Sequence, residues 1–326
     1  MRLATFNLEN LDDRPGHGLP LAARIEALRP VLLRLDADIL CLQEVNAQGR
    51  KHHERRFDAL DALLAETPYA DYERATTESP SGHGGYDVHN LVILGRFPLR
   101  GRRQLRHELV EAPRYRPATA DPRPKEAEPL EWDRPILWAE FALPSGAPLH
   151  VLNLHLRAPR PQPVPGQREG RAWRSVEGWA EGLFMASVKR AGQALEARRL
   201  VDTIFDADPA ARLAVCGDFN ADGRELPLRI VMGPDEGDEA AFSDALLARR
   251  LHALERAVPA EARYSVLHAG RPTMLDHVLV SAALKRAHLG SEIDNADLPD
   301  EVTALDIERV AGSFHAPVAV EFDLGA

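Results

Sequence analysis

The sequence contains little cysteine and no apolar run long enough to cross a membrane. Its two cysteines, Cys41 and Cys216, lie inside apolar segments of the 326-residue chain. We therefore expect buried, reduced thiols and exclude a disulfide framework. No cysteine–histidine spacing typical of zinc occurs. The longest apolar runs, such as ADILCLQEV, are strand-sized and fall well short of the ~20 residues of a membrane helix, so we expect no membrane insertion.

We expect no secretory leader, and basic residues are not in excess. The first residues, MRLATFNLENLDD, are interrupted by polar and acidic side chains where a signal peptide needs an apolar core, so we expect a cytoplasmic location. Acidic residues outnumber basic ones by 50 to 40, which gives a formal charge of −10. A chain of this charge repels polyanions, and this favours small or single-stranded substrates. Arginine carries nearly all the positive charge, a bias that suits phosphate contacts but that genome composition also produces.

Short apolar segments recur along the whole chain and alternate with amphipathic stretches. The apolar spacing predicts helices over residues 22–35, 55–66 and 186–205. Strands are expected at residues 2–6, 37–42, 90–95, 136–142, 149–155, 213–216, 277–281 and 317–322. This alternation predicts an α/β fold with two packed sheets and helices outside them. Because strands occur near both ends, we expect a single domain over residues 1–326.

Two proline-rich segments are expected to be irregular insertions. Residues 111–135 contain six prolines, and residues 157–182 contain four prolines and two tryptophans. Long loops of this kind inside a compact domain are often functional. The second segment begins two residues after His155, so it is either a lid on the substrate side or a loop that packs on the surface.

The segment LAVCGDFNAD, residues 213–222, ends a strand-like run with Asp218 and Asn220 two positions apart. Because side chains alternate along a strand, both would face the same way and could share one ligand. Asp and Asn also stabilise turns at strand ends. The motif alone leaves both interpretations open.

Polar residues lie at the ends of other strand-like runs as well, although each alone also fits a turn, a surface charge or a core histidine. Glu44 and Asn7 offer the oxygen ligands that Mg²⁺ prefers, with Mn²⁺ as a substitute. Histidines could donate protons to phosphate oxygens, and Asp276 could fix a histidine tautomer. The residues at these strand ends are Asn7, Gln43, Glu44, Asn153, His155, Asp276 and His315. Such a set is what hydrolysis of a phosphate ester requires.

Six motifs occur in one order along the chain: TFNLEN, LCLQEV, NLHL, CGDFNAD, LDHVLVS and a final S-x-H before an apolar strand. Together they resemble the endonuclease/exonuclease/phosphatase superfamily, which has a DNase-I-like fold, and they span residues 3–322. The resemblance implies a four-layered α/β sandwich in which helices flank two packed mixed sheets. It also implies metal-dependent cleavage of phosphoester bonds.

The resemblance further implies a role for each matching residue. The implied metal ligands are Asn7 and Glu44, and the implied catalytic residues are His155, Asp218, Asn220, Asp276 and His315. In this scheme His155 contacts the scissile phosphate, and Asp218 with Asn220 positions the attacking water. Asp276 orients His315. Substrate contacts are expected from Asn90, Asn153 and Trp173.

The last motif departs from the family pattern. Ser313-Phe314-His315 stands where the family usually has Ser-Asp-His, so an aspartate on the metal side is missing. Asp306 or Glu308 could supply charge from nearby. Three functions stay open: a Mg²⁺-dependent phosphodiesterase or phosphomonoesterase, a nuclease acting on DNA or RNA, and a non-catalytic protein that binds a phosphate ligand. No protein partner is implied.

Overall fold

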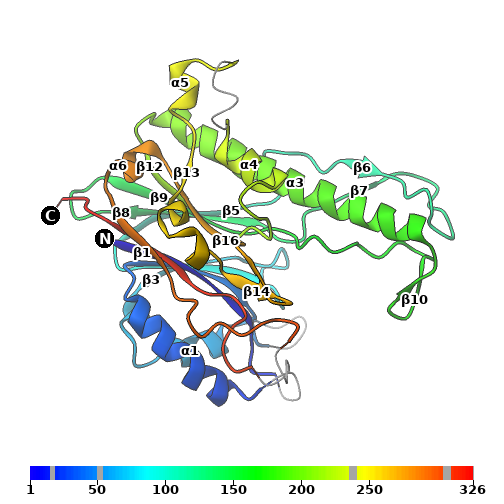
Figure 1. The fold of residues 1–326 in the computed structure, drawn as a ribbon, viewed down its shortest axis with the longest axis horizontal. Coiled ribbons are helices and arrows are strands. Elements are labelled where there is room, and N and C mark those ends of the chain that lie inside the picture. Colours follow the sequence, from blue (N-terminus) through cyan, green and yellow to red (C-terminus); the bar gives the residue numbers. More distant parts are fainter. Residues whose placement is uncertain (15–18, 50–53, 235–240, 304–309, 326) are drawn as a thin grey trace.

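Two six-stranded sheets form the centre of the molecule (Figure 1). The structure is a computed structural model that describes residues 1–14, 19–49, 54–234, 241–303 and 310–325. In each sheet one pair of neighbouring strands is parallel and the other pairs are antiparallel. Both sheets are therefore mixed, as the sequence predicts.

The first sheet joins the beginning of the chain to its end. In spatial order its strands are β17 (His288–Ile293), β18 (Val318–Phe322), β1 (Arg2–Leu11), β2 (Ile39–Val45), β4 (Asn90–Gly95) and β3 (Glu73–Thr76). The second sheet contains β13 (His252–Ala253), β16 (Asp276–Val280), β12 (Arg212–Asp218), β9 (Pro148–His155), β8 (Ile136–Ala142) and β5 (Leu99–Leu105). All eight strands predicted from the sequence are present in these two sheets, and the four other strands of the two sheets lie at their edges.

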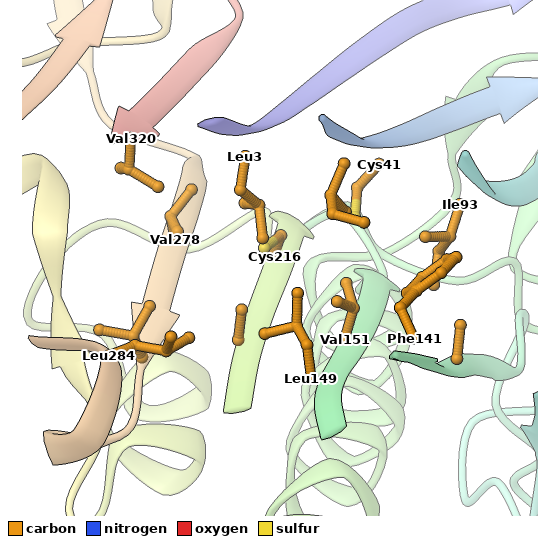
Figure 2. Packing of buried hydrophobic residues seen from close by; sticks show 14 of the residues in the cluster. Leu3, Cys41, Ile93, Phe141, Leu149, Val151, Cys216, Val278, Leu284 and Val320 are labelled. Carbon is orange, nitrogen blue, oxygen red and sulfur yellow. The ribbon is translucent and has the colours of Figure 1, made fainter. Parts of the chain in front are cut away.

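The sheets pack face to face with helices on their outer sides. Side chains such as Leu3, Cys41, Val151 and Cys216 meet between the sheets (Figure 2). Helices α1 (Leu21–Leu35) and α2 (Asp58–Leu64) bury apolar residues against the first sheet. Helices α3 (Val176–Ala207) and α4 (Leu226–Met232) do the same on the second sheet. The four-layered α/β sandwich is confirmed, and both cysteines are buried free thiols.

Shorter elements complete the described chain. Two short helices are α5 (Asp244–Leu247) and α6 (Ala282–Arg286). Three small hairpins pair β6 (Arg114–Tyr115) with β7 (Glu128–Pro129), β10 (Arg168–Glu169) with β11 (Ala172–Trp173), and β14 (Val266–His268) with β15 (Arg271–Thr273). Single 3₁₀ turns lie at Pro68–Asp71, Leu254–Ala257 and Ala260–Ala262. No helix in the described part of the chain is long and apolar enough to span a membrane.

Helix α3 begins ten residues earlier than the sequence predicts. The last residues of the second insertion, which were expected to be irregular, therefore belong to this helix. Ser175 caps the helix by accepting a 2.9 Å hydrogen bond from the Gly178 amide. The sequence prediction rested on the four prolines, but all of them lie before residue 166, ahead of the helix. A Cβ at Gly182 would lie 2.3 Å from the Gln162 carbonyl oxygen. The glycines therefore allow close packing of the loop on the helix, and residues 176–182 are helical.

The two insertions pack on each other and on the first half of α3. We call residues 111–135 and 157–182 the proline-rich lobe, and in Figure 1 it extends to the right of the sheets. Leu130, Val164 and Met185 form a small core there. The Glu181 carboxylate accepts hydrogen bonds from the Tyr115 hydroxyl, from two backbone amides and from a threonine hydroxyl of the first insertion. The single-domain organisation of the whole chain stays a prediction.

Candidate active site

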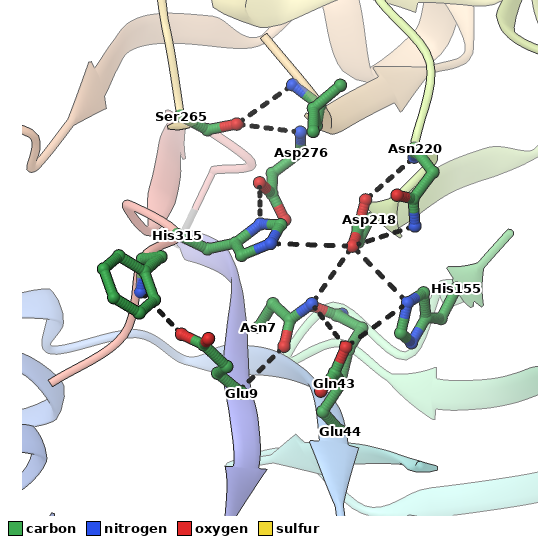
Figure 3. A network of polar contacts seen from close by, with 12 residues as sticks. Asn7, Glu9, Gln43, Glu44, His155, Asp218, Asn220, Ser265, Asp276 and His315 are labelled. Atoms are coloured by element: carbon green, nitrogen blue, oxygen red, sulfur yellow. Dashed lines mark hydrogen bonds and ion pairs between the residues drawn. The ribbon is translucent and has the colours of Figure 1, made fainter. Parts of the chain in front are cut away.

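The predicted strand-end residues converge on one rim of the sandwich. Asn7 pairs with Gln43 where β1 and β2 run side by side. In the other sheet Asp218 pairs with His155 on one side and with Asp276 on the other. Figure 3 shows side chains from both sheets pointing toward one another across this rim. Most of the polar strand-end residues named from the sequence therefore meet here, whereas Asn153 does not.

The Asp218 carboxylate lies at the centre of the cluster and is 2 % exposed. Its Oδ2 accepts hydrogen bonds from Asn7 Nδ2 at 3.0 Å and from Asn220 Nδ2 at 3.2 Å. His155 Nε2 is 3.4 Å from the same oxygen, and His315 Nε2 is 3.9 Å away. Burial raises the pKa of Asp218, the His315 charge opposes that rise and Asp276 adds to it. A carboxylate with a raised pKa can accept a proton near neutral pH.

His315 is held by an aspartate whose charge favours the protonated imidazole. Its Nδ1 lies 2.7 Å from Asp276 Oδ2. Burial alone would lower the pKa of His315, but the charges of Asp276 and Asp218 raise it well above its usual range. Ser265 Oγ accepts the backbone amide of Asp276 at 3.1 Å and so fixes the start of β16. Nε2 of His315 is thus a hydrogen-bond donor that points into the cluster.

His155 differs from His315 in charge. It is 2 % exposed, and burial together with the Arg134 charge lowers its pKa well below the usual range. Its ring is therefore neutral at physiological pH. Gln193 of α3 donates a 3.3 Å hydrogen bond to the His155 carbonyl oxygen and holds the end of β9 in place.

The predicted metal-side residues lie beside this pair of histidines. Asn7 Nδ2 is 3.5 Å from Glu44 Oε1. The Glu44 carboxylate also accepts a 3.1 Å hydrogen bond from the backbone amide of Asn10. Burial opposes ionisation of Glu44, but its side-chain contact with His89 brings the pKa of the Glu44 carboxyl well below its usual range. An ionised carboxylate suits a hard divalent cation. Asn7 turns its amide nitrogen toward Glu44, and its Oδ1 accepts a 2.9 Å hydrogen bond from the Glu9 amide, so Asn7 would have to turn its side chain to offer that oxygen to an ion.

Two groups of side chains at this rim have metal-ligand composition. One ligand atom from each member of a group lies within 4.8 Å of those of the others. The groups are Glu44 with His89 and His155, and Asp218 with Asp276 and His315. The Nδ1 atom of His89, which lies 3.6 Å from Glu44 Oε2, is buried without a hydrogen-bond partner among the described residues. The residues therefore fit a divalent cation on the Glu44 side.

Left-handed backbone conformations gather at the same rim. Positive φ angles occur at five non-glycine residues around the cluster: Glu9 (50°), Asn10 (54°), Glu44 (57°), His89 (58°) and Asn220 (47°). Such conformations cost about 1–2 kcal/mol each in L-residues. Strain of this kind persists where the surrounding structure enforces it, often at functional sites.

The three predicted substrate-binding residues lie outside the cluster. Asn90 is fully buried, and its amide is bonded to Thr77, to Tyr86 and to the Val45 carbonyl oxygen. Asn153 is also fully buried and donates to the carbonyl oxygens of Leu42 and Val92 in the other sheet. Neither side chain offers an exposed group to a substrate, because both hold strands together. Trp173 lies in the proline-rich lobe, with the Arg168 guanidinium 5.3 Å from its ring centroid.

The structure adds two residues that the sequence reasoning missed. Glu9 Oε2 accepts the backbone amide of Phe314 at 2.8 Å, and burial raises the Glu9 pKa. Its signal was its position two residues after Asn7, the spacing that singled out Asp218 and Asn220. His89 directly precedes Asn90 and had no signal of its own. Its Nδ1 lies 3.6 Å from a Glu44 oxygen.

Comparison with solved structures shows which fold this architecture represents. The chain is similar to a 3′ phosphatase, NExo, from Neisseria bound to product DNA hairpin, with 16 % identity, 99 % of each chain covered and a TM-score of 0.54. A mannosyl-6-phosphatase from Bacteroides thetaiotaomicron gives 13 % identity, coverage of 99 % of this chain and 100 % of that one, and a TM-score of 0.59. The human Nocturnin catalytic domain is 18 % identical, with 99 % of this chain and 94 % of that chain covered and a TM-score of 0.55. These likenesses define the fold class as DNase-I-like.

The sequence itself identifies the family. Residues 4–306 match the model of the Endonuclease/Exonuclease/phosphatase family, and the chain belongs to that family. No curated protein sequence gives a significant match. The protein is a hydrolase that acts on phosphoester bonds.

Proposed function

We propose that this protein hydrolyses phosphodiester or phosphomonoester bonds with Mg²⁺ as cofactor, by in-line attack of an activated water. The observation that carries the proposal is the Asp218 carboxylate, which lies between two amides and two histidines at the rim of both sheets. A buried carboxyl with a raised pKa is suited to take a proton from water. Asn220 holds that carboxyl and orients it.

The two histidines are suited to different tasks. His315, kept protonated by Asp276, donates a hydrogen bond to a phosphate oxygen and stabilises the charge that develops there. His155 is neutral and contacts the phosphate without adding a full charge. The Asp276–His315 pair fixes the ring so that only Nε2 faces the substrate.

Glu44 and Asn7 would hold the cation on the other side of the cluster. Bound there, Mg²⁺ would neutralise negative charge on the phosphate oxygens. Glu9 provides a second carboxylate near Glu44. Burial raises the pKa of Glu9, and the two carboxylates are close enough for the charge of Glu44 to raise it further. This carboxylate offsets the missing aspartate at Phe314. Asp306 and Glu308, expected to supply charge from the sequence, lie outside the described residues.

A small or single-stranded phosphodiester is the substrate class that we favour. The net charge of −10 disfavours binding of long polyanions. A nuclease is the alternative with the same chemistry, and a non-catalytic phosphate-binding protein is the alternative without it. A cytoplasmic location stays a prediction as well.

Hydrolysis of bis-p-nitrophenyl phosphate tests the proposal directly. We expect activity with Mg²⁺ or Mn²⁺, loss in excess EDTA and recovery when the metal is restored. Glu44→Ala should abolish the metal response, because it removes the charged ligand. Equal activity in EDTA would contradict the metal assignment. No turnover on this substrate, on single-stranded or plasmid DNA, on RNA or on phosphomonoesters would favour the non-catalytic alternative.

A further inference from the structure

A histidine without a role in the proposed mechanism lies against the metal-side carboxylate. His89 Nδ1 is 3.6 Å from Glu44 Oε2, and His155 Nε2 is 3.7 Å from Glu44 Oε1. We propose that Glu44, His89 and His155 form a nitrogen-rich site for a transition-metal ion of the class of Zn²⁺, Co²⁺ and Mn²⁺. This ion would bind there in preference to Mg²⁺.

The spacing of the three groups fits an ion better than a set of hydrogen bonds. Distances of 3.6 and 3.7 Å are too long for hydrogen bonds. Ligand atoms placed ~2.1 Å from a common ion lie roughly 3.4–3.6 Å apart. The two contacts use the two different oxygens of Glu44, so a bidentate carboxylate or a small rotation of it brings all three side chains onto one ion.

His89 is held in this position by its backbone. Its φ of +58° is left-handed, and its amide donates a 2.9 Å hydrogen bond to Asn46 Oδ1. Asn46 is 4 % exposed and is itself bonded to Asp12. The imidazole therefore faces Glu44 before any ion binds, and its Nδ1 is buried without a hydrogen-bond partner in the described chain. A buried polar atom of this kind is costly unless a ligand satisfies it.

Two imidazoles change which cation the site prefers. Mg²⁺ favours oxygen ligands and keeps several waters, so Glu44 and Asn7 would suffice for it. Later first-row ions gain more from nitrogen ligands. The His89 side chain is 31 % exposed, which leaves an open side for water or a phosphate oxygen. The Glu44 carboxylate can thus hold either Mg²⁺ or a later first-row ion. His89 adds affinity only for the later first-row ion.

Titration of the intact protein with Co²⁺, followed by visible absorption, and calorimetry with Co²⁺ and Mg²⁺ test this site. The wild-type protein should bind Co²⁺ more tightly than Mg²⁺ by at least about 10-fold. His89→Asn should weaken Co²⁺ binding by about 10- to 100-fold and change Mg²⁺ binding by less than about 3-fold. Asparagine tolerates the left-handed backbone at this position, so the variant keeps the loop conformation.

His83→Asn is the matched control, because His83 is exposed in the segment before His89 and should leave both affinities unchanged. A wild-type protein without preference for Co²⁺ would overturn the proposal, as would a folded His89→Asn variant with unchanged Co²⁺ affinity. These binding measurements need no turnover. Failure of the phosphodiesterase assay and failure of this site are therefore separate results.

Discussion

The carboxylate of Glu9 accepts a hydrogen bond from the backbone amide of Phe314, with 2.8 Å between Oε2 and N. The family's last motif usually carries an aspartate at position 314. Here the acid comes from β1, and the Phe314 ring is 5 % exposed and packed. In the proposed site, the Glu9 carboxylate therefore takes the place of the carboxylate that the last motif lacks. An aspartate introduced at position 314 should therefore not improve metal binding.

Phe314→Asp should destabilise the protein and leave metal affinity unimproved. Removing a buried phenyl ring costs about 3–5 kcal/mol of unfolding free energy, and the new charge would lie beside Glu9. Urea unfolding and Mg²⁺ titration measure the two effects. Glu9→Gln, in comparison, should weaken Mg²⁺ binding with a smaller loss of stability. An equally stable Phe314→Asp protein that binds Mg²⁺ several-fold more tightly would refute this account.

Asp218→Asn should keep the fold and substrate affinity while kcat falls by at least ~10²-fold, the usual scale for loss of a general base. The substitution is nearly isosteric, and Oδ1 can still accept the hydrogen bond that the Asn220 backbone amide now donates at 2.8 Å. The new Nδ2 would face the amide donors of Asn7 and Asn220, so a modest loss of stability is expected without loss of the fold. Steady-state kinetics and thermal unfolding give the two readouts. A variant that unfolds instead would support a role for Asp218 in turn formation.

Glu181→Gln should destabilise the proline-rich lobe in a pH-dependent way. Burial opposes ionisation of Glu181, but hydrogen bonds from Thr119 and the Ala118 amide lower its pKa to about 2. A carboxyl with a depressed folded-state pKa stabilises the fold above its unfolded pKa, ~4.3, and loses that contribution as pH falls toward 2. At pH 7 the variant should lose about 1–3 kcal/mol.

Urea unfolding of wild type and Glu181→Gln between pH 7 and pH 3 checks this prediction. The stability difference should be constant at high pH and shrink below about pH 4.5. Glu177→Gln is a control on the same helix, since Glu177 is exposed. A difference that grows on acidification would contradict the assignment.

Trp179→Ala should increase KM for extended substrates and leave KM for small substrates unchanged. Trp179 is 42 % exposed on α3, and Arg190 of the same helix bonds the Asn220 carbonyl oxygen at 2.5 Å. At 1.5 Å per residue, Trp179 lies roughly 16 Å along the helix from that contact. A small phosphodiester at Asp218 cannot reach it, whereas an oligonucleotide can.

Kinetics on bis-p-nitrophenyl phosphate and on a single-stranded oligonucleotide separate the two cases. We expect an unchanged KM for the small ester and an increased KM for the oligonucleotide. Equal KM values for both proteins on the oligonucleotide would mean that the lobe packs on the surface without contacting substrate. This result would also weaken the nuclease alternative.

The sequence determined the inner strands and the residues at their ends. All eight predicted strands are inner strands, and most of their residues are buried and apolar, although β8 and β18 each carry a glutamate that is not buried. The edge strands, such as β5 with its sequence LRGRRQL, expose one face and carry no apolar run. Asp218 and Asn220 do lie together, but through a turn rather than through strand alternation, because Asn220 follows the end of β12 with a φ of +47° and its amide donates a hydrogen bond to Asp218 Oδ1.

Only the tertiary structure decided which polar groups face one another. Glu9 and His89 reach the cluster through left-handed backbone conformations, which break the alternation that a linear sequence suggests. Asn90 and Asn153 looked equally suited to a substrate, yet their amides are bonded within and between the sheets. A side chain's hydrogen-bond partners depend on strand register and sheet packing, and these are set by contacts between residues far apart in the sequence.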